Sequence, residues 1–394
     1  LPYLYTSIGM VQGIIYTILA ATMLGITCIV YIRCLEIAAE MDPKRRMYRM
    51  EDVAEYCFGR WFFWVAMIGI NLTAFSIDLS FHILIGSLFT GIADLGKHSE
   101  FYWKLICCAP FLILCAPKDM RVIAKFGFLG VIGVVVIIVA ISIASAEAIH
   151  DNQVGPDQKA VAFVEGQTVK DSLSGLSTFV FSCGCLPVIP SLYEDMGEKN
   201  RKKLPHSVFW TYVTVAILFL AVSVPGYIAF GTEAPSQFLD PDGPVHDGYY
   251  GPWLAATVAC LVHIFVVYPL LMNGPIRAIE DFLPDKLLWR LGVRVVLVFT
   301  GFGLACTPIS FFSEIVGLIP ASIFGVVGLI FPPLFYWKLL YMKDGSVGAV
   351  LATTKRKLTF CLHVAIWIIA VVAIVMGVWG QINSLIDKLN DNDD

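Results

Sequence analysis

A succession of long apolar segments constrains this chain more than any other feature of its sequence. Each segment runs for about 20 residues or more, the length that an α-helix needs to cross a lipid bilayer. Of the 394 residues, 58% are hydrophobic and only 15% are charged, which is more apolar surface than a soluble core needs. The segments therefore predict an all-α polytopic membrane protein, because a helix satisfies its own backbone hydrogen bonds in lipid.

The apolar segments predict ten membrane spans after a shorter opening helix. Leu1–Ile8 is too short to span, and we interpret it as the second half of a helix whose first half lies outside this sequence. We find no low-complexity tract and no separate soluble domain, so we predict one transmembrane domain over residues 1–394. The predicted spans are Val11–Ala38, Trp61–Thr90, Tyr102–Ala116, Arg121–Ile149, Ser172–Met196, Ser207–Phe230, Trp253–Phe282, Arg290–Thr307, Ser310–Tyr341 and Leu358–Ile386.

The loops between these spans alternate in charge. Loops at 40–50, 198–206 and 342–357 are rich in Lys and Arg, whereas the long loops at 151–170 and 232–251 are acidic. Because cytoplasmic loops carry an excess of Lys and Arg, the first set is predicted to be cytoplasmic and the second set outside or luminal.

One short segment on the predicted cytoplasmic side does not span. Met50–Phe58 is too short and too charged to cross a bilayer. It predicts either a helix that lies on the inner membrane surface or an ordinary solvated loop helix.

The predicted span Ser172–Met196 contains a break. Regular helix should end around Ser182–Cys185, and Pro187 and Pro190 then open a second helical piece, since proline has no amide to donate and suits a helix start. Backbone groups left unpaired at membrane depth must be satisfied by protein or by a bound solute. The amide end of the second piece suits a carboxylate. The break is therefore either a substrate site or a proline kink with only a structural role.

Motifs of several other function classes do not occur. The sequence has no phosphate-binding Gly-rich loop followed by Lys and Ser or Thr, no HExxH and no nucleophile elbow, so we predict neither an enzyme nor an ATP-driven pump, and no cofactor. The eleven cysteines form no obvious disulfide framework, and we interpret them as small apolar packing residues. Cys183 and Cys185 flank Gly184, but two thiols without a nearby His or third Cys make a poor metal site. No metal and no nucleic-acid partner are expected.

Several stretches together resemble the amino acid/auxin permease family, the proton- or sodium-coupled amino acid transporters. Leu1–Tyr3 resembles the family's first-helix motif, and Tyr48–Gly59 resembles its inner-surface helix. Phe181–Met196 resembles the broken sixth span, Tyr268–Leu270 the eighth span and Pro308–Tyr341 the tenth span. Their order and spacing carry the resemblance, which covers nearly the whole chain. Within the family, the chain is similar to the vesicular inhibitory amino acid and vacuolar transporters.

The resemblance implies a fold and a function. The fold would have eleven helices, two inverted five-helix repeats plus one, with discontinuous first and sixth helices facing each other across the midplane. The function would be secondary active transport of small neutral amino acids by alternating access, by a monomer in the lipid bilayer of the plasma membrane or of a vacuolar or vesicular membrane. The implied substrate-binding residues are Leu1, Pro2, Tyr3, Ser182, Cys183, Gly184 and Cys185.

Polar residues within the predicted spans carry the ion-coupling hypothesis, since a charge near the bilayer centre costs about 2.5–3.5 kcal/mol on insertion scales. Asp78 and His82 lie four residues apart on one helical face, and they form either a proton relay or gate, or a local pair facing the outer vestibule. His263 lies in the eighth span, and histidine is the side chain whose charge ordinarily changes near neutral pH. It either loads and releases the coupled proton, or it is a histidine hydrogen-bonded to a neighbouring carbonyl.

Three alternatives remain open at this point. Sodium-coupled relatives offer hydroxyl and carbonyl oxygens in the eighth span, and Thr257 could supply one here. His263 has no side-chain oxygen, so we expect coupling to protons, with His263 as the principal group and Asp78 as the second. The same fold could also serve as an amino acid sensor. A channel is the third class, although neither a selectivity filter nor an oligomeric pore is visible.

Overall fold

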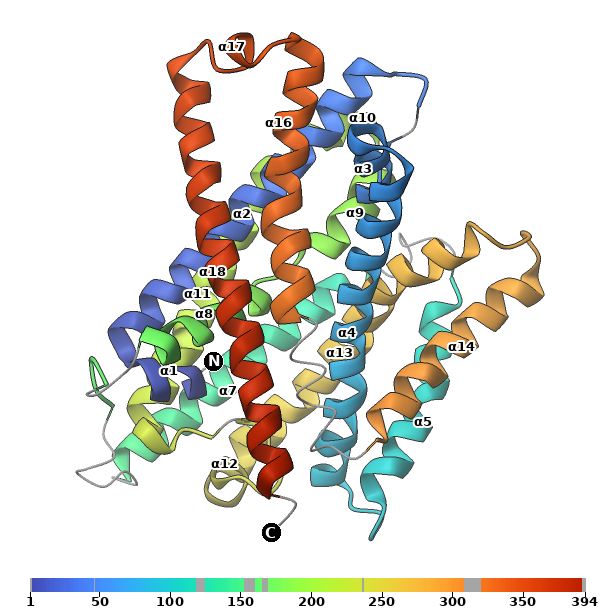
Figure 1. Cartoon of the computed structure of the whole chain (residues 1–394). Helices are drawn as coiled ribbons and strands as arrows, with labels where there is room; N and C mark the ends of the chain where they lie inside the picture. Colours follow the sequence, from blue (N-terminus) through green and yellow to red (C-terminus); the bar gives the residue numbers. More distant parts are fainter. Residues whose placement is uncertain are drawn as a thin grey trace. The chain divides into compact units, whose positions relative to one another are not determined.

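The computed structural model describes residues 2–45, 47–117, 125–151, 160–164, 169–235, 237–307 and 320–391, and its regular elements are all helices (Figure 1). They are α1 (Pro2–Ile8), α2 (Met10–Met41), α3 (Met50–Phe58), α4 (Arg60–Ile92), α5 (Ser99–Cys115), α7 (Gly127–His150), α8 (Val169–Ser182), η2 (Leu186–Val188), α9 (Ile189–Asp195), α10 (Glu198–Arg201), α11 (Leu204–Phe230), η3 (Gly231–Glu233), α12 (Pro244–Gly248), α13 (Tyr250–Glu280), α14 (Leu287–Ala305), η4 (Pro320–Phe324), η5 (Val326–Ile330), α16 (Phe331–Asp344), α17 (Val347–Val350) and α18 (Thr354–Asp391).

Nine segments of the described chain are long and apolar enough to cross a membrane. They are Met10–Met41, Arg60–Ile92, Gly127–His150, Gly175–Glu194, Leu204–Glu233, Tyr250–Glu280, Leu287–Ala305, Ser322–Asp344 and Thr354–Asn383. The remaining predicted span, Tyr102–Ala116, corresponds to α5, which has 17 residues and is at the lower limit for crossing a bilayer. Part of the predicted span Ser310–Tyr341 lies outside the described residues, which resume at Pro320. The prediction of an all-α polytopic membrane protein is confirmed.

The chain divides into two compact units, each built from three separate stretches. The first unit comprises residues 1–17, 74–175 and 217–316, and the second comprises residues 18–73, 176–216 and 317–394. Four of the boundaries fall within helices α2, α4, α8 and α11. The single transmembrane domain over residues 1–394 stays a prediction.

In the first unit, a buried lysine links the predicted outer ends of α4, α5 and α14. The Lys104 side chain is only 5% exposed, and its Nζ donates to Glu100 Oε2 at 3.1 Å and to the carbonyl oxygen of Ala305 at 3.2 Å. Gly86 in α4 leaves space for it, since a Cβ there would lie 2.5 Å from Lys104 Cε. The cation therefore satisfies a carbonyl at the end of α14 that has no partner within that helix.

A buried arginine does the same at the opposite end of this helix pair. Arg294 in α14 donates from Nε to the carbonyl oxygen of Cys115, the last residue of α5, at 2.8 Å, and from Nη1 to the Glu280 carboxylate. Each of the two helices thus supplies a buried cation to the last carbonyl of the other. The helices run in opposite directions and lie side by side, drawn in cyan and orange in Figure 1.

We predict that Arg294→Gln destabilises the protein by about 3 kcal/mol, because it leaves the Glu280 carboxylate buried without its cation. The matched control is Arg290→Gln, one turn away. Its carboxylate neighbour Asp285 lies 3.8 Å away and is 76% exposed, so the effect should stay below about 0.5 kcal/mol. Thermal unfolding in detergent micelles measures both. Equal midpoints for the two variants would contradict the role given to Arg294.

In the second unit, α3 packs against neighbouring helices through one face. Its residues Val53, Ala54 and Cys57 are buried, and Phe58 contacts Phe335 in α16 with 6.2 Å between ring centroids. Burial raises the pKa of Cys57 to about 12, so this thiol remains protonated at neutral pH. The predicted helix Met50–Phe58 is present with the expected bounds, and it is partly buried rather than fully solvated.

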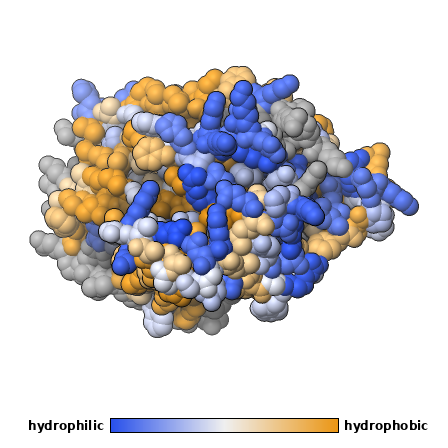
Figure 2. All heavy atoms as spheres, turned by 90° about the horizontal axis from the view of Figure 1, so that it is seen from above, coloured by the Kyte–Doolittle hydropathy of each residue, from blue (hydrophilic) through white to orange (hydrophobic). Residues whose placement is uncertain are grey.

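The three loops predicted to be cytoplasmic lie on one side of the second unit. Lys343, near the end of α16, pairs with Glu40, near the end of α2, at 2.9 Å. The Arg201 guanidinium, in α10, lies over the Tyr48 ring at 4.7 Å. Figure 2 views the end at which α3, α10 and α17 are drawn, and hydrophilic side chains gather there. The structure places the three loops on one side of the second unit, and the assignment of that side to the cytoplasm stays a prediction.

Side-specific labelling tests that assignment on a cysteine-reduced background. We expect Asn200→Cys to react with an impermeant maleimide only from the cytoplasmic side, because the loop 198–206 is basic. The control is Asp242→Cys, in the acidic loop 232–251, which should react only from the other side. Native Cys57 should stay unlabelled because its pKa is about 12. Outside labelling at position 200 would invert the topology.

Candidate functional site

The predicted break in the sixth span is present in the second unit. Helix α8 ends at Ser182, Cys183–Cys185 is irregular, and the short turn η2 leads into α9. The Gly184 amide donates to the carbonyl oxygen of Phe181 at 2.9 Å, so it is already used. In the part of the chain that is described, the amides of Cys185 and Leu186 donate to no backbone oxygen. The open donors of the break therefore lie one and two residues after Gly184.

Side chains from other helices of the second unit surround the break. The ring of Phe324, in η4, lies against Gly184, where a Cβ would be 2.5 Å from Phe324 Cζ. Phe324 also makes an edge contact with Phe181, with 6.0 Å between ring centroids. The segments η4 and η5 are wound more loosely than an α-helix, a form that is frequent at functional sites.

The two cysteines of the break differ in their surroundings. Cys183 is buried, whereas the Cys185 thiol lies 3.2 Å from the Tyr212 hydroxyl of α11. The same hydroxyl lies 3.3 Å from the thiol of Cys28 in α2. Ser182 is exposed, and its hydroxyl donates to the carbonyl oxygen of Thr178 at 2.8 Å. Tyr212 therefore ties the break to α2 and α11.

The opening residues of the chain belong to the first unit. Leu1 lies outside the described residues. Pro2 is buried against α11, where a Cβ on Gly226 would lie 2.9 Å from Pro2 Cγ, and the Tyr3 side chain is 49% exposed. The predicted substrate-binding residues are thus divided between the two units.

Asp78 and His82 in α4 form the polar centre of the first unit. Both side chains have no exposed surface. Among the described residues, neither carboxylate oxygen of Asp78 has a hydrogen-bond partner. His82 is directed to Tyr268 in α13, with 3.0 Å between His82 Nε2 and the Tyr268 hydroxyl. The direct Asp78–His82 pair that the sequence left open is not formed in this structure.

Four helices enclose His82. Its ring makes edge contacts with Phe111 of α5 and with Tyr268, at 5.0 and 5.3 Å between centroids, and those two rings stack on each other at 3.8 Å. On α14, Gly301 leaves room for the imidazole, since a Cβ there would lie 3.0 Å from His82 Nε2. Asp78 lies within electrostatic reach of Tyr268. An acid, an imidazole and a phenol therefore gather beside an apolar cluster of the first unit, with the buried Lys104 cation within electrostatic reach of His82.

His263 and Thr257, both in α13, lie in different surroundings. His263 is partly exposed, and its Nδ1 lies 3.1 Å from the carbonyl oxygen of Gly130 in α7. This is the carbonyl-bonded histidine that the sequence left open as an alternative. Thr257 is fully buried, and its hydroxyl has no hydrogen-bond partner among the described residues.

Sequence reasoning gave no role to three side chains that shape these places: Tyr212, Tyr268 and Phe324. Tyr268 entered only as part of a stretch resembling the eighth span. A phenol in mid-span is the available signal for the two tyrosines, because a buried tyrosine hydroxyl usually has a partner. Phe324 gives no such signal. No group of three or more His, Cys, Asp or Glu side chains suited to a metal occurs in the described ranges.

A family model described as transmembrane amino acid transporter protein matches residues 1–376. The chain belongs to this family. The resemblance to the amino acid/auxin permeases is thereby confirmed, and the transmembrane amino acid transporter family is one of transporters and not of enzymes. The chain is a multi-pass membrane protein, as its spans predict.

Relatives in the transmembrane amino acid transporter family are distant in sequence. Amino acid transporter AVT1I of Arabidopsis thaliana is 23% identical over 320 residues, which cover 77% of this chain and 75% of that protein. Vacuolar amino acid transporter 7 of Saccharomyces cerevisiae is 24% identical over 70% of this chain and 54% of its own length. Amino acid transporter AVT1D of Arabidopsis thaliana is 25% identical over 55% of this chain. The chain spans little more than a third of AVT1D, 37% of its length.

Proposed function

We propose that this chain is a secondary active transporter of small neutral amino acids that works by alternating access and is coupled to protons. The observation that carries the coupling is Asp78, a carboxyl with no exposed surface and no hydrogen-bond partner among the described residues. An ionised carboxylate in such a place is strongly disfavoured unless it is paired. A transporter can use this by letting the carboxyl bind a cation in one state and release it in another.

The proposed proton acceptor is Asp78, with His82 and Tyr268 beside it. The histidine is bonded to the tyrosine hydroxyl and not to the acid, so the acid can gain or lose its proton without breaking that bond. His263 keeps a secondary role, because its Nδ1 is occupied by a backbone carbonyl. This reverses the order of importance that the sequence suggested.

The proposed fold is the inverted five-plus-five repeat with discontinuous helices 1 and 6. We count α1 as the first span, leave out the short helices α3, α10 and α12, and take α8 and α9 as the two halves of one span. Then α5 is the fourth span and α14 the ninth, which are equivalent positions in two five-helix repeats. The reciprocal contacts support this equivalence, since Lys104 of α5 binds the end of α14 and Arg294 of α14 binds the end of α5.

The proposed substrate site is the break at Ser182–Cys185, and the substrate-binding roles that the resemblance gives to Leu1, Pro2 and Tyr3 stay predictions. The break supports this role, because the amides of Cys185 and Leu186 remain open among the described residues and suit a carboxylate. The membrane is proposed to be that of an acidic organelle, in keeping with the vacuolar relative from yeast. We propose that the protein acts as a monomer in the bilayer.

Sodium coupling is the second candidate, and Thr257 favours it. Its buried hydroxyl, without a hydrogen-bond partner in the described ranges, is an oxygen of the kind that Na⁺ binds. We prefer coupling to protons over coupling to sodium because Asp78 is a titratable group. The Thr257 hydroxyl cannot carry a proton across the membrane at physiological pH.

Uptake into proteoliposomes tests the proposal. The purified chain is supplied with each of twenty radiolabelled L-amino acids under an imposed pH gradient. We expect saturable, stereoselective accumulation of small neutral amino acids that is unchanged when Na⁺ is replaced by K⁺ or choline. Counterflow would separate a transporter from a sensor, and lack of saturation would indicate a channel. Transport that stops when sodium is removed at fixed pH would show that protons are not the driving ion.

A further inference from the structure

Arg201, at the end of α10, lies between two tyrosine rings of the second unit. Its guanidinium is 4.7 Å from the centre of the Tyr48 ring and 4.8 Å from the centre of the Tyr193 ring. The same group donates from Nε to the carbonyl oxygen of Tyr193 at 2.9 Å and from Nη2 to that of Glu194 at 3.3 Å. We call Arg201, Tyr48 and Tyr193 the arginine clamp.

The two carbonyls belong to the last turn of α9, the short helix that follows the break. Carbonyls in the last turn of a helix have no partner within it, and a cation there also interacts favourably with the helix dipole. Helix α9 has only seven residues, and Leu192 on its surface is 42% exposed. The clamp is therefore one of the contacts that hold the second half of the broken helix in place, beside the buried side chains of Ile189 and Tyr193.

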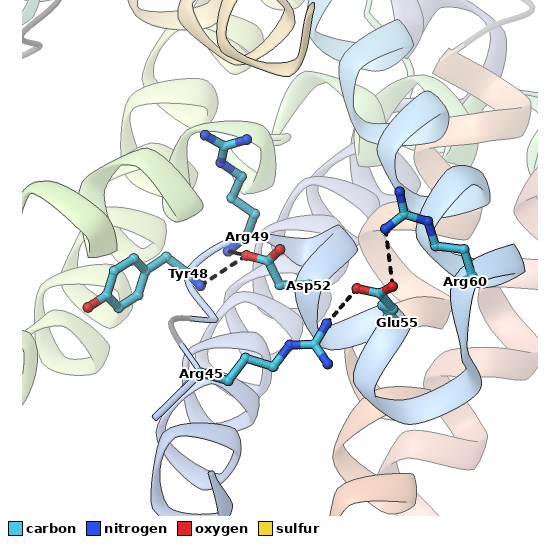
Figure 3. Close-up of polar contacts among 6 residues, drawn as sticks. All are labelled: Arg45, Tyr48, Arg49, Asp52, Glu55 and Arg60. Carbon is cyan, nitrogen blue, oxygen red and sulfur yellow. Dashed lines mark hydrogen bonds and ion pairs between the residues drawn. The ribbon is translucent and has the colours of Figure 1, made fainter. Parts of the chain in front are cut away.

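The other side of the clamp is anchored on α3. The backbone amides of Tyr48 and Arg49 donate to the Asp52 carboxylate at 3.3 and 3.2 Å, which fixes the chain at the start of the helix (Figure 3). Glu55, one turn further along α3, accepts from Arg45 at 2.5 Å and from Arg60, the first residue of α4, at 3.2 Å. The Tyr48 ring thus projects from the start of α3, where the Asp52 carboxylate holds the amides of Tyr48 and Arg49.

We infer that Arg201 and Tyr48 are positioning residues for transport, which hold the second half of the broken helix against α3 and release it when the cytoplasmic side opens. The inference rests on the proposed transport function. Lysine cannot replace the arginine fully, because a planar guanidinium covers two rings and reaches two carbonyls at once, whereas an ammonium is a compact point charge.

Hydrogen–deuterium exchange of the full-length protein in nanodiscs tests the clamp without a substrate. The amides of α9 should exchange about tenfold faster in Arg201→Gln and about threefold faster in Arg201→Lys than in the wild type. The amides of α16 should exchange at the wild-type rate in both variants. Tyr48→Leu removes one ring without touching the carbonyls and should resemble the lysine variant. The matched control is Lys202→Gln, the next and exposed cation, which should change nothing.

Transport kinetics supply the second measurement, with the panel of radiolabelled L-amino acids as probes. Loosening α9 lowers the population of the outward-facing state, so Arg201→Gln should raise KM for uptake from the outer side about tenfold with a smaller change in Vmax. Unchanged exchange in α9, or equal acceleration in α9 and α16 in both Arg201→Gln and Tyr48→Leu, overturns the inference. If the wild-type chain moves no amino acid, the proposed function fails and the inference fails with it. Wild-type transport combined with unchanged α9 exchange overturns the clamp alone.

Discussion

Asp78→Asn is expected to reduce accumulation driven by a pH gradient at least about tenfold, while exchange of amino acids at equal pH persists. Asparagine keeps the size of the side chain but cannot bind and release a proton. The coupled step therefore loses its acceptor, whereas the substrate site in the break is untouched. Accumulation under an imposed gradient and counterflow at symmetric pH, both in proteoliposomes, measure the two activities separately.

The matched control is Asp94→Asn. Asp94 lies two residues beyond the end of α4, is exposed, and accepts a hydrogen bond from the Gly96 amide at 2.9 Å. Its loss should leave accumulation unchanged. Full accumulation in Asp78→Asn would remove this residue from the mechanism, and loss of accumulation in His263→Ala alone would give that role to the histidine of α13. A sodium requirement that disappears in Asp78→Asn would instead identify the bound cation as Na⁺.

Gly184→Leu is expected to abolish substrate uptake while the protein still reaches the membrane. Any Cβ at this position would lie 2.5 Å from Phe324 Cζ and 3.0 Å from the carbonyl oxygen of Phe181. Either the break or the phenylalanine must move, and overpacking of this kind costs about 1–3 kcal/mol of stability. Uptake affinity is measured with the amino acid panel described above.

A second variant separates the steric effect from general damage. Gly184→Ala should weaken uptake, and Phe324→Leu in the same chain should restore part of it by withdrawing the ring. Gly197→Ala is the control, since a Cβ at Gly197 meets nothing within 4 Å. Unchanged affinity in Gly184→Leu would exclude the break as the substrate site.

Much of the fold could be predicted from the sequence, because the bilayer restricts what a chain can do. A spanning segment must be apolar, helical and about 20 residues long, so each of its properties is local and can be read from consecutive residues. Met10–Met41 extends the predicted span Val11–Ala38 by one residue at its start and by three at its end. The break at Cys183–Cys185 could be predicted in the same way, because the prolines that follow it restrict the conformation of the adjacent backbone.

The partners of the polar groups were decided only by the tertiary structure. Asp78 and His82 are four residues apart and suggest a pair, yet the histidine binds Tyr268, 186 residues further along the chain. Cys185 meets Tyr212, and through the tyrosine hydroxyl it is linked to Cys28.

The physical reason is that solvation by lipid constrains single segments, whereas hydrogen bonds between helices constrain pairs of segments. Solvation by lipid acts on every segment separately, so the sequence determines where the helices and the break occur. A hydrogen bond between two helices depends on how both are rotated and on what space neighbouring glycines leave, as Gly301 does for His82. These properties belong to the packed helices together, and no single segment of the sequence contains them.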